Sequence, residues 1–170
     1  QTLIMSPERV RRTLRRLAYE ILERNQGAEA LDLFGILESG APLARSIARE
    51  INSIEGSNLS AHDLDVTPFR DDQPEATPPP TDAEHDVDVT DRNVILIDDV
   101  LFTGRTARAA LDAVLQHGRP RSIQLVVLID RGHREYPIQP DCTGRLLQTK
   151  HRERVVVETD DYAVYVRDEA

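Results

Sequence analysis

The sequence contains almost no cysteine. Cys142 is the single cysteine among 170 residues, which excludes an internal disulfide and a thiolate metal cluster. We therefore expect a protein of a reducing compartment and predict a cytoplasmic location. Histidine does not supply a metal site either, because the five histidines lack metal-ligand spacing; they are His62, His85, His117, His133 and His151.

Long hydrophobic runs are also missing. The longest apolar runs, Val94–Ile97 and Leu125–Ile129, fall far short of the roughly 20 residues that span a bilayer. The sequence thus predicts no membrane span and no membrane partner. Residues 1–7 lack a positive segment followed by an apolar core, so we expect no signal peptide, and the unusual first residue leaves open whether the N-terminus is native. A length of 170 residues fits one domain, 1–170.

Positive charge is in short supply. Lys and Arg together number 21 against 30 Asp and Glu, which gives a formal net charge of -9. Because affinity for polyphosphate depends mainly on neutralising phosphates with Lys and Arg, this balance argues against a generally nucleic-acid-binding surface. An acidic surface is typical of a solvated protein, and any RNA binding must come from a local patch.

One local patch of positive charge lies near the N-terminus. Five arginines fall within the eight residues 9–16, on a predicted helix whose apolar stripe includes Val10 and Leu14. Helical spacing places Arg9, Arg12 and Arg16 on the side opposite this stripe, whereas Arg11 and Arg15 flank it. Further basic clusters occur at 131–134 and 150–154. The patch is a candidate for RNA binding through Arg9, Arg12, Arg15 and Arg16, and a solvated helix face or a dimer contact explains it equally well.

Apolar periodicity predicts alternating strands and helices. The first helix begins at Ser6-Pro7-Glu8, where a capping hydroxyl, a proline and an acid come together, and it ends at residues 25–27. Strands are expected at 31–36, 64–69, 94–97 and 122–129, helices at 40–54 and 105–117, and a C-terminal hairpin from 155–158 and 162–166. This order predicts an α/β fold in which a parallel-strand sheet is flanked by helices.

The segment from Asp71 to Asp91 breaks this pattern. It is rich in prolines and acids and holds almost no bulky apolar residues, so it cannot bury enough surface to fix its own structure. Two interpretations stay open from composition alone: a disordered linker, or a lid that orders over a substrate.

The stretch VILIDDVLFTGRT, residues 94–106, contains the strongest functional motif. Asp98 and Asp99 directly follow an apolar strand, and in open α/β sheets ligands bind at the carboxyl ends of strands. The turn Thr103-Gly104-Arg105-Thr106 then enters a helix, whose first N–H groups lack intrahelical partners and bind anions. A phosphate in this turn and hydroxyls on the two carboxylates fit the two ends of a ribose 5-phosphate.

Other phosphate and metal motifs fit this stretch less well. A Walker loop is excluded, since residue 105 is Arg instead of Lys and Asp99 stands where the first glycine belongs. A dinucleotide fingerprint is absent. Phosphoacceptor receiver domains also place adjacent acids after a strand, but near the N-terminus and with a further acid and a Lys that are not clear here.

At these residues the sequence resembles the type I phosphoribosyltransferases, and more closely the PyrR family. The resemblance extends over nearly the whole chain and includes 11–25, Gly56, Asp65-Val66-Thr67, 69–72, 118–120, 122–125 and Asp130-Arg131-Gly132-His133-Arg134-Glu135. It implies a type I phosphoribosyltransferase fold with a small hood built from the chain's ends. It also implies that residues of about 71–91 form a flexible active-site loop, which favours the lid interpretation.

The resemblance implies uracil phosphoribosyltransferase activity, which makes UMP and pyrophosphate from uracil and phosphoribosyl pyrophosphate with Mg²⁺ held through the substrate. It also implies binding of pyrimidine operon mRNA in transcription attenuation, and a homo-oligomer that is a dimer or larger.

The resemblance also implies roles for single residues. Asp98 and Asp99 bind the ribose hydroxyls and are the catalytic residues, and the 5′-phosphate is bound by Thr103, Gly104, Arg105 and Thr106. Asp130 and Arg131 lie near the expected uracil pocket, although a structural ion pair accounts for them equally well. The substrate-binding stretch consists of Val94, Ile95, Leu96, Ile97, Asp98, Asp99, Val100, Leu101, Phe102, Thr103, Gly104, Arg105 and Thr106.

One turn departs from the family pattern. After the first strand, where relatives carry a basic Thr-Arg-Gly turn that grips pyrophosphate, this chain has Glu38-Ser39-Gly40. The glycine is kept, but an acid now lies beside a highly negative leaving group and should weaken its binding. Two alternatives to the uracil enzyme therefore stay open: a non-catalytic nucleotide-sensing RNA-binding regulator, and a purine phosphoribosyltransferase.

Overall fold

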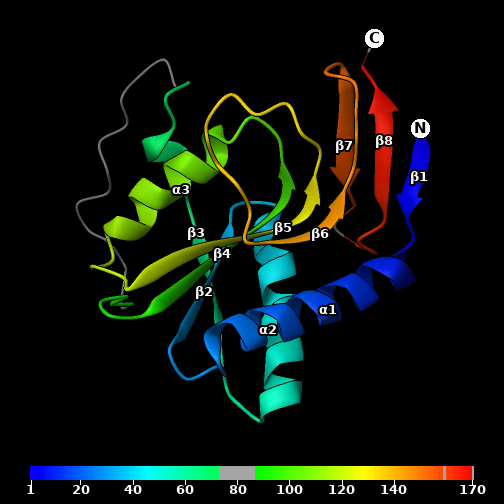
Figure 1. Cartoon of the computed structure of the whole chain (residues 1–170). Coiled ribbons are helices and arrows are strands. Elements are labelled where there is room, and N and C mark those ends of the chain that lie inside the picture. Colours follow the sequence, from blue (N-terminus) through cyan, green and yellow to red (C-terminus); the bar gives the residue numbers. More distant parts are fainter. Residues whose placement is uncertain (73–86, 159, 170) are drawn as a thin grey trace.

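The computed structural model describes residues 1–72, 87–158 and 160–169, and places two sheets side by side (Figure 1). The larger sheet has the order β3-β2-β4-β5-β6, and all its neighbouring strands are parallel. Its strands are β2 (Leu31–Ile36), β3 (Ala61–Leu64), β4 (Asn93–Leu101), β5 (Ser122–Asp130) and β6 (Cys142–Leu146). The predicted parallel-strand sheet is confirmed.

Helices cover both faces of this sheet. Helices α1 (Pro7–Asn25) and α2 (Gly40–Glu55) lie on one face, and α3 (Arg105–Leu115) lies on the other (Figure 1). Successive side chains of β4 therefore enter different cores. Ile95 and Ile97 lie in the core under α1 and α2, and Val94 and Leu96 lie in the core under α3. A strand that is apolar on both sides is typical of a parallel sheet buried between helix layers.

The chain's ends form the second sheet. Strands β1 (Thr2–Met5), β8 (Val164–Asp168) and β7 (Glu153–Val157) pair in that order and are antiparallel. Both termini therefore lie at this small sheet (Figure 1). The predicted C-terminal hairpin is confirmed, and β1 adds a third strand that periodicity did not indicate.

The predicted strand at 64–69 is wrong over most of its length. Strand β3 ends at Leu64, and a single 3-10 turn follows at Thr67–Phe69. The Thr67 N–H donates to the Asp65 carboxylate, and Pro68 has no N–H to offer to a strand ladder. The chain therefore turns here and brings Arg70 toward the start of α3.

Other element boundaries also differ from expectation. Strand β4 continues past Ile97 to Leu101 because it stays paired with β5 as far as Asp130, and α3 ends at Leu115. Strand β6 was not predicted, since its five residues include glycine, arginine and threonine. Most of the predicted 71–91 loop, residues 73–86, lies outside the described residues. Within the described part of the chain, no helix has the length and apolar character needed to cross a membrane.

Candidate active site

The two acids of the motif lie on β4, the middle strand of the parallel sheet. Asp98 and Asp99 are both part-buried, and the strand continues through them to Leu101. The Asp99 N–H donates to the Asp98 carboxylate (2.8 Å), and the Val100 N–H donates to the Asp99 carboxylate (2.7 Å). These local bonds fix both side chains before any ligand binds.

Burial raises the pKa of the Asp98 carboxyl well above its usual range, and the neighbouring charge of Asp99 raises it further. Both effects disfavour the ionised form of Asp98. A carboxyl group whose pKa is raised in a cavity is a candidate for function.

A cavity of about 150 Å³ opens beside Asp98. It is closed by the turn that leads from β4 into α3 and by side chains of the neighbouring strand β5. The lining residues are Arg70, Asp98, Val100, Leu101, Phe102, Thr103, Gly104, Thr106, Ala107, Leu125 and Val127. The structure thus brings most of the predicted substrate-binding turn to one cavity.

Gly104 makes the turn into α3 possible. Its φ of 93° is a left-handed conformation that favours glycine, and a Cβ here would lie 3.2 Å from the Ile138 side chain. The carbonyl of Thr103 accepts from the N–H groups of Glu135 (2.9 Å) and Tyr136 (3.0 Å). The turn is therefore held in place by the segment that follows β5.

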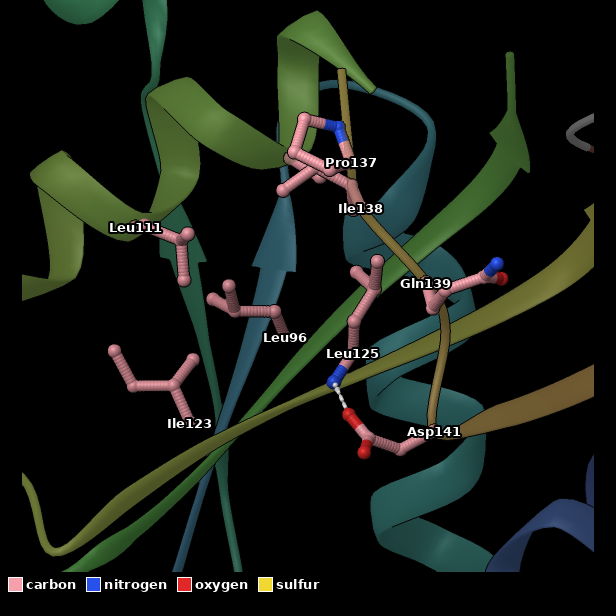
Figure 2. Close-up of a pocket in the computed structure, with 9 residues that line it drawn as sticks. Leu96, Leu111, Ile123, Leu125, Pro137, Ile138, Gln139 and Asp141 are labelled. Atoms are coloured by element: carbon pink, nitrogen blue, oxygen red, sulfur yellow. Dashed lines mark hydrogen bonds between the residues drawn. The ribbon is translucent and has the colours of Figure 1, made fainter. Parts of the chain in front are cut away.

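That segment is packed over α3 around a second hollow of about 220 Å³ (Figure 2). Pro137 and Ile138 approach the hollow from one side and Leu111 from α3, above Leu96 and Leu125 of the sheet (Figure 2). The Leu125 N–H donates to the Asp141 carboxylate (2.8 Å) and ties the end of the segment to β5. This packing positions Ile138 against Gly104.

The predicted pyrophosphate turn lies against the acidic pair. A Cβ on Gly40 would meet the Ile97 carbonyl oxygen and would lie 3.2 Å from the Asp98 Cα, so only glycine fits. Glu38 is exposed, and Ser39 precedes α2 without capping it through its side chain. Gly40 and Asp98, far apart in sequence, thus meet on the sheet.

Arg105 takes a different place from the one expected. Its guanidinium donates to Asp71 (2.8 Å), to Glu135 (3.0 Å) and to the Tyr136 hydroxyl (2.7 Å), and it does not line the cavity. The cation on the cavity is Arg70, which sequence reasoning missed as a site residue. Two signals were available: Arg70 is the last Lys or Arg before a stretch without either that ends at Arg92, and it lies in the stretch 69–72 that carries part of the family resemblance.

The buried pair at the end of β5 does not form the ion pair considered from the sequence. Asp130 pairs with Arg134 (2.6 Å), not with its neighbour Arg131. Arg131 instead donates to the Thr149 hydroxyl (3.1 Å) and the Lys150 carbonyl (3.0 Å), with its guanidinium 4.0 Å from the centre of the Phe102 ring. Because Phe102 lines the cavity, Arg131 lies just behind its wall.

The arginine patch lies on the exposed side of α1. Arg9, Arg12 and Arg15 are exposed, and Arg12 lies 4.0 Å from Glu8. Arg16 has structural partners, because it donates to Glu20 (2.6 Å) and to the Gly144 carbonyl of β6 (2.6 Å). The other two basic stretches, 131–134 and 150–154, are linked by the hydrogen bond that Arg131 donates to the Lys150 carbonyl.

Metal ligands are sparse. Among the described residues, no three His, Cys, Asp or Glu side chains gather as a metal site. Mg²⁺ beside phosphates usually takes most of its ligands from substrate and water, and binding of Mg²⁺ through the substrate stays a prediction.

Comparison with known proteins identifies the family to which this chain belongs. Residues 6–163 match the phosphoribosyl transferase domain family. The bifunctional protein PyrR of Clostridium novyi is 45% identical over 159 residues, which cover 92% of this chain and 89% of that protein. The bifunctional protein PyrR of Deinococcus radiodurans is 48% identical over 160 residues, which cover 93% of this chain and 87% of that protein.

Among solved structures, the hypoxanthine phosphoribosyltransferase of Trypanosoma cruzi has a TM-score of 0.74 to this chain, at 17% identity. The match covers 99% of this chain and 98% of that one, and at this identity it speaks for the fold alone. The predicted type I phosphoribosyltransferase fold is thereby confirmed, and the chain belongs to the phosphoribosyltransferase family and, within it, to the PyrR proteins.

Proposed function

We propose that this protein transfers the phosphoribosyl group of phosphoribosyl pyrophosphate to N1 of uracil and releases UMP and pyrophosphate. One observation carries the proposal: Gly40 of the pyrophosphate turn packs on Asp98, and Asp98 lines the same cavity as Thr103 and Thr106. The residues proposed to bind pyrophosphate, ribose and the 5′-phosphate are therefore neighbours.

The 5′-phosphate binds in the turn before α3. The first N–H groups of the helix point toward it, and the hydroxyls of Thr103 and Thr106 donate to it. The carboxylates of Asp98 and Asp99 accept from the ribose 2′ and 3′ hydroxyls. Held at both ends, the sugar presents its C1 atom toward the turn at 38–40.

Breaking the bond from C1 to pyrophosphate gives the sugar the character of an oxocarbenium ion. Asp98 and Asp99 lie where this positive charge develops, and preorganised charge of this kind is the largest single contribution in many enzymes. Burial disfavours the ionised form of Asp98 in the free protein, whereas a positive charge on the sugar favours it. Mg²⁺ held through the substrate beside Asp98 and Asp99 would supply positive charge to the leaving pyrophosphate, and this charge would offset the repulsion from Glu38. Asp130, the last residue of β5, and Arg131, whose guanidinium lies behind Phe102, form the part of the site that we assign to uracil.

We also propose that the exposed arginines of α1 bind pyrimidine operon mRNA, with Arg9, Arg12 and Arg15 contacting phosphates. Arg16 contributes less, because its guanidinium is already engaged by Glu20 and Gly144. Replacing Arg9 and Arg12 by Gln should weaken RNA binding and flatten its dependence on salt, since each phosphate contact contributes to the slope. If the salt dependence of RNA binding is unchanged in this variant, the patch is instead a solvated helix face or a subunit contact.

The cytoplasm is the proposed location and a homo-oligomer, a dimer or larger, the proposed assembly, with residues 1–170 as one phosphoribosyltransferase domain. The loop assigned to 71–91 closes over the substrate in this proposal and excludes water from the activated sugar. A non-catalytic regulator is the second candidate function, and the observation that favours it is the acid at Glu38 beside the pyrophosphate turn.

The deciding experiment measures UMP formation from uracil, phosphoribosyl pyrophosphate and Mg²⁺, with hypoxanthine in a parallel assay. Wild-type protein should form UMP, and Asp99→Asn should lower kcat by about 100-fold or more, the usual effect of removing one group that stabilises the transition state. Activity with hypoxanthine instead of uracil would make the protein a purine enzyme. UMP binding without turnover would make it a regulator.

A further inference from the structure

Arg70 is the guanidinium that lines the cavity beside Asp98. The 3-10 turn at 67–69 packs on α3 and delivers Arg70 to the start of that helix. Its Nη1 group donates to the Thr106 hydroxyl (2.9 Å), one of the two hydroxyls of the phosphate turn. Arg70 therefore lies within hydrogen-bond reach of the place where the motif would hold a phosphate.

Asp72 holds Arg70 through two parallel bonds. Nε of Arg70 donates to Oδ1 of Asp72 and Nη2 donates to Oδ2, both at 2.9 Å. This two-pronged geometry is also the one in which a guanidinium binds a phosphate. The Asp72 side chain is half exposed, so it can leave Arg70 and become solvated without a large burial cost.

Arg105 does not compete for this role. Asp71, Glu135 and Tyr136 occupy its guanidinium on the outer side of the turn, and the Tyr136 hydroxyl in turn donates to Asp71. These contacts hold Arg105 over the Tyr136 ring, 4.6 Å from its centre. Arg105 thus stabilises the turn from outside, while Arg70 faces the ligand space.

We propose that Arg70 is a further ligand of the 5′-phosphate, and that Asp72 is the internal anion that occupies Arg70 until the phosphate replaces it. The proposal rests on the proposed function, because it requires a sugar phosphate in the Thr103–Thr106 turn. A phosphate with two negative charges offers Arg70 and Thr106 stronger hydrogen bonds than one carboxylate does. Asp72 thereby weakens the binding of every ligand that carries the 5′-phosphate.

Calorimetry with UMP, and with uridine as the ligand without phosphate, tests the exchange. Arg70→Gln should weaken UMP binding by about 10- to 100-fold, the value of a hydrogen bond to a charged group, and leave uridine binding within twofold. Asp72→Asn should tighten UMP binding by about two- to fivefold, the value of an exposed ion pair, again without effect on uridine. Arg108→Gln is the matched control, because Arg108 lies on the same turn of α3 as Thr106, is exposed and pairs with Asp112.

UMP binding should weaken in Arg70→Gln and tighten in Asp72→Asn, whereas a loss of folding would weaken it in both variants. Thermal unfolding of each variant checks that the variant is folded. Wild-type UMP affinity in Arg70→Gln would overturn the inference while leaving the proposed function intact. Equal loss of UMP and uridine binding in that variant would overturn it as well. A wild-type protein that binds neither UMP nor phosphoribosyl pyrophosphate would overturn the proposed function and the inference together.

Discussion

Gly40 packs directly on the backbone of Asp98, so closely that a Cβ on Gly40 would lie 3.2 Å from the Asp98 Cα and would meet the Ile97 carbonyl. The contact joins the start of α2 to the middle of β4 and sets the distance between the turn at 38–40 and the acidic pair. Neither partner can move aside cheaply, because both contacts are with backbone.

The first prediction concerns this contact. Gly40→Ala should lower the free energy of unfolding by about 1–3 kcal/mol, the usual cost of overpacking, and should move the turn away from Asp98. Urea unfolding and UMP formation measure the two effects. Ser53→Ala, on the exposed side of the same helix, is the control and should change neither. Wild-type stability in Gly40→Ala would mean that α2 shifts without penalty.

The second prediction uses the raised pKa of Asp98. Burial disfavours the ionised form, so folding favours the protonated carboxyl. This contribution to stability is fully present below the unfolded-state pKa of about 3.9 and is lost as the pH rises through the higher pKa of the folded protein. Asp98→Asn never ionises, and its Tm should exceed that of the wild type at pH 8 by about 2–4 °C for each kcal/mol gained.

The difference in Tm should shrink toward zero as the pH falls to about 4, where wild-type Asp98 is also neutral. Asp112→Asn on the surface of α3 is the control and should follow the wild type at every pH. A difference for Asp98→Asn that is the same at pH 4 and pH 8 would contradict the assignment of the raised pKa to Asp98.

The third prediction addresses the unusual pyrophosphate turn. Ser39→Arg adds a cation beside the leaving group and should tighten phosphoribosyl pyrophosphate binding by about 10-fold, the value of one hydrogen bond to a charged group. Ser53→Arg adds the same charge on the exposed side of α2 and controls for long-range attraction. If both variants bind equally well, net charge and not the turn is responsible.

The fourth prediction concerns Arg134, which joins three acceptors. It donates to Asp130 (2.6 Å), to the Ile138 carbonyl (2.8 Å) and to the Phe102 carbonyl (3.0 Å). A lysine cannot reproduce this planar fork, so Arg134→Lys should lower the free energy of unfolding by about 2–3 kcal/mol. Urea unfolding measures it, with Arg108→Lys as the exposed control. A change no larger than that of the control would show that the three bonds add little.

The sequence by itself determined the features that rest on neighbouring residues. The run of apolar residues at 94–97, the acids at 98–99 and the turn at 103–106 lie in one short stretch, so the sequence predicted a strand, an acidic pair and an anion-binding turn together, although β4 continues through the acids to Leu101. Alternation of strands and helices predicted the parallel sheet, since each element carries its own periodicity. The resemblance carried by these same stretches pointed to the family that the comparisons show.

Only the tertiary structure decided which residues meet across the chain. Sequence favoured Arg105 as the cation of the phosphate turn, but the fold engages it with Asp71 and Glu135 and places Arg70 on the cavity instead. It also pairs Asp130 with Arg134 and sets Gly40 against Asp98. Side-chain direction and close packing between distant segments depend on the whole fold, because the same residue can satisfy its charge with any partner that the packing brings within reach.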